Sequence, residues 1–141
     1  MWIDLNFVNS FLQKTQLMST IILKDESYAI IGKCMEVHNN LGAGFSEIVY
    51  KDALEYEFRK ASIPFEREKK YSVKYKEVIL PHHFFADFVV FDKIILEIKG
   101  TKEIKDEYIA QSINYLKVSD NPLALIVNFG ELRLNYKRIV L

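Results

Sequence analysis

The sequence predicts an α/β fold in which helices cover both sides of a central mixed β-sheet. Residues 25–61 carry apolar side chains at helical spacing, and residues 65–99 have the alternating or continuous apolar patterns of consecutive strands. A third helical segment, residues 105–118, separates these strands from two later ones. This order of helices and strands is typical of domains in which one sheet packs between helices.

Two helices are expected before the first strand. In residues 25–40, apolar residues recur every three or four positions, which is the period of one helix face. The segment Leu41–Gly44 then contains two glycines, which tolerate the backbone angles that end a helix. A second helix is expected over residues 46–61.

Pro64 marks the change from helices to strands. Residues 65–75 alternate charged and apolar side chains, as in a half-exposed strand. A short strand over residues 78–80 follows, and residues 83–91 and 93–99 are expected to form two more. The nearly continuous apolar content of these two is expected of central strands that are covered on both faces.

The last part of the chain is predicted to contain one helix and two strands. The helix is expected over residues 105–118, and a strongly apolar strand over residues 123–129. Gly130-Glu131 is expected to form a tight turn into a final strand over residues 132–139.

The beginning of the chain fits this domain poorly. We therefore expect an N-terminal extension over residues 1–24, with helical character, and one domain over residues 25–141. Met18 is a candidate alternative start. In that case residues 1–17 are an added segment that packs on the domain or on a neighbouring molecule, as in a homodimer. An ordinary extra helix is the open alternative.

The composition limits the possible function classes. The 19 Lys and Arg residues balance the 19 Asp and Glu residues, so any nucleic-acid surface must be a local patch. Cys34 is the only cysteine, which excludes an intramolecular disulfide and favours a reducing compartment. Apolar runs are too short for a membrane span, and the N-terminus lacks the basic region of a signal peptide, so a cytoplasmic location without membrane contact is expected.

The residues best suited to chemistry lie between Asp87 and Lys99. Side chains alternate along a strand, so Glu97 and Lys99 point to the same side of the sheet, and Asp87 lies on the neighbouring strand. Two carboxylates on adjacent strands can bind one hard cation such as Mg²⁺ (or Mn²⁺). A lysine beside that ion can activate the attacking water or stabilise charge on a phosphate. An ordinary ion pair on a solvated sheet face is the alternative.

Two pairs of helical residues add to this set. Gln111 and Tyr115 are four positions apart on one helix, so they share a face and offer neutral donors for phosphate or base contacts. Glu47 and Tyr50 share a face of the second helix, where Glu47 could supply a third carboxylate. The open alternatives are an ordinary amphipathic boundary and a first-turn acid that favours the helix dipole.

Several sequence blocks follow one another in order between residue 25 and the C-terminus. The first block, residues 37–50, reads VHNNLGAGFSEIVY. The later blocks are Ala86–Val90, Leu96–Lys99, Gln111–Leu116, Asn128–Gly130 and Lys137–Val140. On these blocks the chain resembles the GxxExxY protein family, which is placed in the PD-(D/E)XK nuclease superfamily.

This resemblance implies a restriction-endonuclease-like core over residues 25–141 and a role for individual residues. The implied catalytic residues are Asp87, Glu97, Lys99 and Glu47. The three acids among them are the implied metal ligands. The candidate substrate-binding residues are Gln111, Tyr115, Tyr50 and His38. Of these, Gln111 and Tyr115 match a QxxxY element, whereas His38 could equally be a boundary histidine on its helix.

The sequence therefore predicts a Mg²⁺-dependent nuclease that hydrolyses nucleic acid, with DNA as the expected substrate. Lysines within residues 69–76, together with Lys102 and Lys105, are candidates for the local basic patch. Two positions depart from the family pattern: Ala86 stands where the superfamily name expects proline, and Tyr108 stands where many relatives have histidine. The alternative function is a non-catalytic nucleic-acid-binding or protein-interaction module that retains the nuclease fold.

Overall fold

The computed structural model describes residues 4–10, 13 and 22–141 of the chain. Two helices and three strands come first: α2 (Lys24–Leu41), α3 (Glu47–Lys60), β1 (Phe65–Tyr75), β2 (Val78–Val90) and β3 (Ile94–Lys99). One helix and two strands follow: α4 (Asp106–Ser119), β4 (Leu123–Asn128) and β5 (Asn135–Ile139).

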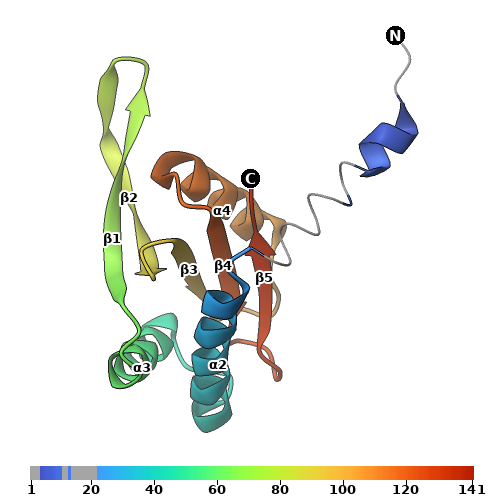
Figure 1. Ribbon diagram of the computed structural model, residues 1–141. Helices are drawn as coiled ribbons and strands as arrows, with labels where there is room; N and C mark the ends of the chain where they lie inside the picture. Colours follow the sequence, from blue (N-terminus) through green and yellow to red (C-terminus); the bar gives the residue numbers. More distant parts are fainter. Residues whose placement is uncertain (1–3, 11–12, 14–21) are drawn as a thin grey trace.

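The five strands form one mixed sheet in the order β1-β2-β3-β4-β5 (Figure 1). Neighbouring strands are antiparallel except β3 and β4, which are parallel. A parallel pair needs a crossover connection, and α4 provides it. Helices α2 and α3 pack on one face of the sheet and α4 packs on the other. The predicted α/β class, with a mixed sheet between helices, is confirmed.

The larger part of the core lies under α2 and α3. The helical period predicted for residues 25–40 is confirmed, because its apolar positions face the sheet. The buried apolar side chains of α2 are Ile30, Ile31, Cys34 and Val37. From α3 come Tyr50, Leu54 and Phe58. A smaller cluster on the opposite face includes Leu116 of α4.

The N-terminal extension is described only in part. Residues 5–10 are helical, and Leu5 and Phe7 there are 70% and 69% exposed. Met18 lies outside the described residues, so the predicted extension over residues 1–24 and the alternative start stay predictions. Within the described part of the chain, no helix combines the length and the apolar content that crossing a membrane requires.

Strand β2 is one continuous strand, whereas separate strands over residues 78–80 and 83–91 were expected. The sequence around Pro81 suggested a loop between them. The register between β1 and β2 shifts between Ser72 and Lys74, and Pro81 falls within the same irregular part of the ladder. Proline is tolerated at such an irregularity because it lacks only the N–H that a regular ladder would use. The strand therefore continues through Pro81.

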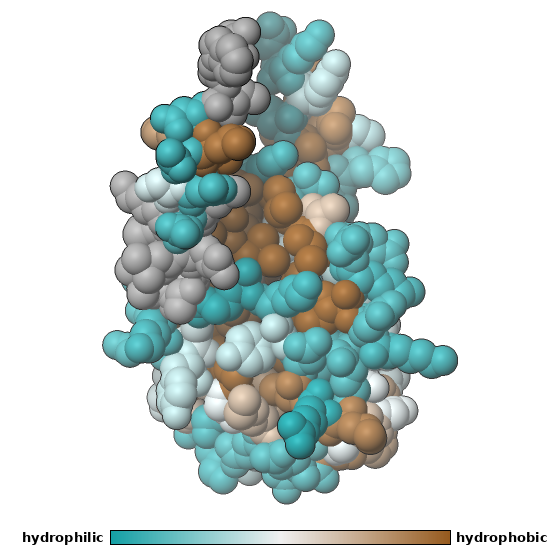
Figure 2. Space-filling model, turned by 90° about the vertical axis from the view of Figure 1, so that its right-hand side faces the viewer, coloured by the Kyte–Doolittle hydropathy of each residue, from teal (hydrophilic) through white to brown (hydrophobic). Residues whose placement is uncertain are grey.

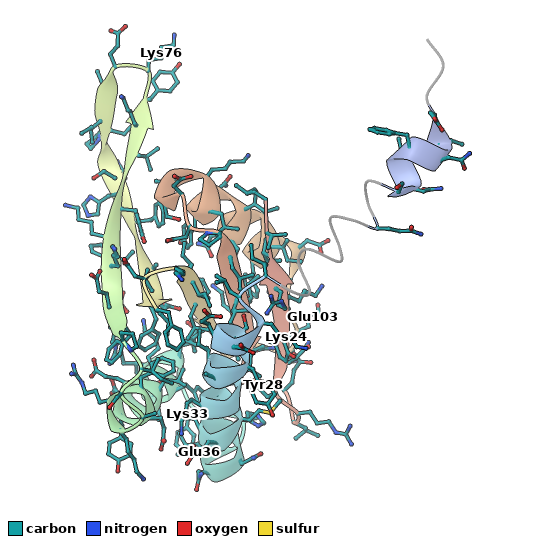
Figure 3. All side chains as sticks on the ribbon, in the orientation of Figure 1. Lys24, Tyr28, Lys33, Glu36, Lys76 and Glu103 are labelled. Atoms are coloured by element: carbon teal, nitrogen blue, oxygen red, sulfur yellow. The ribbon has the colours of Figure 1, made fainter. Side chains whose placement is uncertain are left out.

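The far part of the β1–β2 hairpin extends beyond the other strands (Figure 1). Because β3 pairs only with residues 88–90 of β2, residues 78–86 of β2 pair with β1 alone among the described residues. We call residues 69–86 the arm. Its outer part, residues 74–83, is exposed throughout and carries the 70% exposed side chain of Ile79. Lys76 lies at the tip (Figure 3).

Strand β5 begins at Asn135, later than the expected start at residue 132. The side chain of Glu131 accounts for the difference. Its Oε2 atom accepts hydrogen bonds from the side-chain amides of Asn128 at 2.7 Å and Asn135 at 3.2 Å. These bonds hold the connection between β4 and β5 as a loop instead of a tight turn.

Asn128, fully buried at the end of β4, joins that strand to the end of β3. Its Oδ1 atom accepts hydrogen bonds from the backbone nitrogens of Thr101 at 3.0 Å and Gly130 at 3.1 Å. Its Nδ2 atom donates to the carbonyl oxygen of Thr101 at 2.9 Å. The backbone nitrogen of Phe129 also donates to the carbonyl oxygen of Lys99 at 2.8 Å. This network fixes the backbone at Lys99, a predicted site residue.

We expect Gly130→Ala to destabilise the protein. A Cβ atom there would lie 2.2 Å from the carbonyl oxygen of Thr101 and 2.4 Å from its nitrogen, so backbone atoms would have to move. The free energy of unfolding should fall by about 1–3 kcal/mol, as for other overpacked sites, and urea unfolding measures it.

Gly32→Ala is the matched control for Gly130→Ala. A Cβ atom at Gly32 meets no atom within 4 Å, and alanine is favoured over glycine in a helix by up to about 1 kcal/mol. Gly32→Ala should therefore be neutral or stabilising. Equal stability of both variants would contradict the close contact at Gly130.

Candidate active site

The pairing of β2 with β3 brings Asp87 and Glu97 together. Phe88 pairs with Leu96 in these antiparallel strands. Asp87, one residue before Phe88, therefore lies opposite Glu97, one residue after Leu96. The backbone nitrogen of Asp87 donates to Glu97 Oε1 at 3.3 Å, and the backbone nitrogen of Ile98 donates to Asp87 Oδ2 at 2.8 Å. The two carboxyl groups therefore form one compact pair across adjacent strands.

Glu97 is the more enclosed acid of this pair, with only 4% of its surface exposed. Burial raises the pKa of Glu97 well above its usual range, and the negative charge of Asp87 raises it further. The backbone hydrogen bond from Asp87 and the positive charge of Lys99 act in the opposite direction but are weaker. The site thus resists holding two negative charges unless more positive charge is supplied.

Lys99 follows Glu97 by two positions and lies on the same side of β3. Its ammonium group lies 4.6 Å from the ring centroid of Tyr108 on α4, within the range of a cation–π contact. Because its charge acts on the pKa of Glu97, Lys99 is electrostatically part of the acid pair. Tyr108, one of the two departures from the family pattern, thus contacts a candidate site residue.

Helix α4 supplies Tyr115 beside the acids. Its ring stacks on Phe84 of the arm, with centroids 4.0 Å apart and planes 2° from parallel. Burial, and then the charges of Glu97 and Asp87, raise the pKa of Tyr115 to about 12. The hydroxyl is therefore protonated near neutral pH and can donate a hydrogen bond. Gln111 is half-buried one turn earlier on α4.

Glu47, the predicted third acid, is the first residue of α3 and lies beside the end of β3. Its Oε1 atom accepts a hydrogen bond from the backbone nitrogen of Gly100 at 3.3 Å, directly after Lys99. Among the described residues, no group of three or more His, Cys, Asp or Glu side chains is gathered closely enough to hold a metal ion. The structure therefore brings Asp87 and Glu97 together but does not join Glu47 to them.

Tyr50 and His38, the two other candidate substrate-binding residues, are buried. The hydroxyl of Tyr50 donates to the carbonyl oxygen of Gly42 at 2.6 Å, and its ring stacks on Phe129 with centroids 4.6 Å apart. Nε2 of His38 lies 2.9 Å from the carbonyl oxygen of Glu131. These contacts give both residues a structural role between the glycine turn and the β4–β5 loop, and their contact with substrate stays a prediction.

Two site residues were missed by the sequence analysis, and Lys51 is the first. Its Nζ atom lies 3.0 Å from Asp87 Oδ1 and also forms an ion pair with Glu68. Burial lowers the pKa of Lys51, but its hydrogen bonds with Glu68 and Asp87 and their charges outweigh this, so the net pKa is raised. The only sequence feature that pointed to Lys51 as a site residue was its position one helical turn after Glu47.

Glu68, the second, has an unusual backbone for a residue in a strand. It lies between the pairs Arg67–Phe88 and Lys69–Ala86, which places it opposite Asp87. Its φ of 54° is in the left-handed region that residues other than glycine rarely adopt. No sequence pattern predicts such a conformation at a glutamate within an alternating strand.

The donor atoms of the acid pair fit a hard divalent cation. Mg²⁺ and Mn²⁺ prefer carboxylate oxygens, and two carboxyl groups that resist joint ionisation gain most from a cation between them. Asp87 and Glu97 meet both conditions.

A separate hollow of about 360 Å³ between α2 and β5 is lined by none of the predicted site residues. Figure 2 shows the β5 side of the molecule, where apolar side chains gather in the middle and hydrophilic ones surround them.

Asp87 on β2 and Glu97-Ile98-Lys99 on β3 correspond to the D and (D/E)XK parts of the motif that names the PD-(D/E)XK proteins, with Ala86 in the place of proline. A family model described as PD-(D/E)XK nuclease superfamily matches residues 24–139, and the chain belongs to this superfamily. Searches of curated proteins and of solved structures each returned no match. The narrower resemblance to the GxxExxY family stays an interpretation of the sequence blocks.

We expect Glu97→Gln to stabilise the protein in metal-free buffer at neutral and higher pH. The pKa of Glu97 is raised in the folded state, so the folded protein binds its proton more tightly than the unfolded chain. Wild-type stability should therefore fall as pH rises from the usual glutamate pKa through the raised value, and glutamine removes that loss.

Thermal unfolding at a series of pH values, from the usual glutamate pKa upward, measures this difference. Glu103→Gln, at an exposed position in the loop after β3 (Figure 3), is the control and should leave the pH profile unchanged. Identical pH profiles for wild type and Glu97→Gln would show that Glu97 does not titrate in this way.

Proposed function

We propose that the protein is a metal-dependent nuclease that hydrolyses phosphodiester bonds in nucleic acid, with DNA as the expected substrate. One observation carries the proposal: Asp87 and Glu97 form a compact acid pair on adjacent strands, with the charge of Lys99 acting on it. Membership in the PD-(D/E)XK superfamily supports the same activity, because divalent metals and nucleic acids are typical of its nucleases.

In this proposal, Asp87 and Glu97 would hold Mg²⁺ (or Mn²⁺). Glu47 of α3, whose Oε1 atom accepts the hydrogen bond from Gly100, would be the third ligand. The ion would supply Lewis-acid stabilisation of the phosphate and lower the pKa of a bound water. Lys99 orients the attacking water or stabilises negative charge that develops on the phosphate. The contact with Tyr108 restricts the positions that the Lys99 side chain can take.

Gln111 and Tyr115 are the proposed substrate-positioning residues. The charges of Glu97 and Asp87 act on the pKa of Tyr115, and Gln111 lies four residues earlier on α4, so the two side chains share a helix face. A neutral amide and a protonated phenol can donate hydrogen bonds to phosphate oxygens or bases without competing for the metal.

The arm supplies the local positive charge that a neutral protein needs for nucleic-acid binding. Residues 69–83 contain four lysines and two histidines against one acidic residue, Glu77. Three of the lysines, Lys70, Lys74 and Lys76, are exposed. The major groove of duplex DNA admits a two-stranded β-ribbon, which is the shape of the arm. Asp87 lies directly after the arm in β2, so nucleic acid on the arm would extend toward the acid pair.

Cleavage of DNA in the presence of Mg²⁺ or Mn²⁺ tests the proposed activity. Lys99→Met and Glu97→Gln should each lower the cleavage rate by about 100-fold or more, as is usual when a charge-stabilising group is removed. Lys93→Met, at an exposed position in the β2–β3 turn, should leave the rate unchanged. Metal-independent binding of DNA without cleavage would favour the non-catalytic module instead.

The role of the arm is tested by the triple variant Lys70→Ala, Lys74→Ala, Lys76→Ala. We expect DNA binding in metal-free buffer to weaken by about 10-fold or more. The dependence of log Kd on log salt should become shallower, by about 0.9 for each phosphate that the variant no longer neutralises. Fluorescence anisotropy at several salt concentrations measures both quantities.

A second triple variant controls for the change in net charge. It removes three exposed lysines outside the arm: Lys24, Lys60 and Lys93. If this variant weakens binding as much as the arm variant does, the arm is not the nucleic-acid surface.

A further inference from the structure

Lys51 reaches from α3 into the acid pair and occupies one oxygen of Asp87. Its Nζ atom lies 3.0 Å from Asp87 Oδ1, and only 12% of its side chain is exposed. The other oxygen of Asp87, Oδ2, accepts the backbone hydrogen bond from Ile98 at 2.8 Å. Both oxygens of the proposed metal ligand are therefore engaged by the protein itself.

A cation that binds Asp87 can leave the N–H of Ile98 in place, because each carboxylate oxygen has two lone pairs, but it is repelled by the positive charge of the Lys51 ammonium at Oδ1. The backbone nitrogen of Ile98 is fixed within β3, in the buried middle of the sheet. Lys51 ends in an ammonium on a flexible side chain, so this group can move by rotation of the terminal bonds. The ammonium is thus the partner that an incoming cation displaces.

A displaced ammonium would normally lose its counter-charge, but Lys51 already has a second one. Glu68 forms an ion pair with the same Nζ atom from β1. The left-handed backbone of Glu68 lies opposite Asp87, and so the carboxylate of Glu68 is presented at this point of the ladder. Lys51 can therefore release Asp87 and still keep one carboxylate partner.

We propose that Lys51 is a displaceable internal counter-ion of the site: it neutralises Asp87 while no metal is bound and moves onto Glu68 when the metal binds. The side chain thereby sets the affinity of the site for the ion. It lowers that affinity, because every ion that binds must displace it. In the metal-free protein, its positive charge offsets the repulsion between the carboxylates of Asp87 and Glu97. This inference rests on the proposed metal-dependent function.

The first test is the affinity of Lys51→Met for Mn²⁺ and Mg²⁺, measured by calorimetry and by the metal-induced shift in Tm. Methionine keeps an apolar stem of similar length and removes the charge. We expect the affinity to rise by about 10-fold, corresponding to about 1.4 kcal/mol. The Tm without metal should fall, and the increase in Tm on adding metal should be larger than in wild type.

Lys33→Met is the matched control, because Lys33 also contacts two carboxylates, Glu36 at 3.2 Å and Glu57 at 4.0 Å. Lys33 lies on α2, on the side that faces α3, and neither of these two contacts involves Asp87 or Glu97 (Figure 3). Its loss should leave the metal affinity unchanged. Lys51→Gln gives the same measurement if the methionine variant does not yield folded protein.

A double-mutant cycle distinguishes displacement from a general effect of charge. Glu68→Gln removes the second partner of Lys51, so Lys51 should bind Asp87 more persistently and the metal affinity should fall several-fold. In the Lys51→Met background the same substitution should have little effect, because the side chain through which Glu68 acts is gone. A general loss of negative charge would weaken metal binding equally in both backgrounds.

The possible results separate this inference from the proposed function. Tighter binding by Lys51→Met, together with a Glu68 effect that depends on Lys51, supports the counter-ion. Unchanged or weaker binding by Lys51→Met, or an equal Glu68 effect in both backgrounds, overturns it while wild-type metal binding and cleavage still stand. Absence of metal binding in wild type and all variants overturns the counter-ion and the proposed nuclease together.

Discussion

The close approach of Asp87 and Glu97 is the constraint to which the surrounding structure responds. Two carboxyl groups that are largely removed from water repel each other, and burial alone makes Glu97 costly to ionise. Positive charge comes from Lys51 on α3 and from Lys99 on β3. Backbone nitrogens of Asp87 and Ile98 add hydrogen bonds. The chemistry of the site thus depends on β2, β3 and α3 keeping their relative positions.

Strand β4 pairs with β3 along its length and holds it in place, and all six residues of β4 are buried. Asn128 satisfies four polar groups at the point where the backbone turns away after β3, and Phe129 is hydrogen-bonded to Lys99. A buried amide with this many partners is costly to replace, since any shorter or charged side chain leaves some of them unsatisfied. The sequence block Asn128–Gly130 therefore has a structural explanation that does not involve substrate.

Local patterns were sufficient to predict most of the fold and the close placement of three candidate site residues. Strand alternation placed Glu97 and Lys99 on one side, and the short hairpin placed Asp87 beside them, because both features depend on near neighbours in the sequence. Tyr50 belongs to the first of the family-like sequence blocks, residues 37–50. Its ring stacks on Phe129, which is far away in the chain. The role of Lys51 depends on how α3 packs over the sheet and on one unusual backbone angle. Long-range packing of this kind leaves no local periodic signal.

Within the part of the chain that the structure describes, β1 and β5 are the two outermost strands, and each pairs with another strand on one side only. Strand edges of this kind invite strand addition by another chain unless charged side chains discourage it. Residues 66–70 of β1 are all charged, and β5 carries Lys137 and Arg138 in succession. These charged side chains make the pairing of either edge strand with a strand of another copy less favourable.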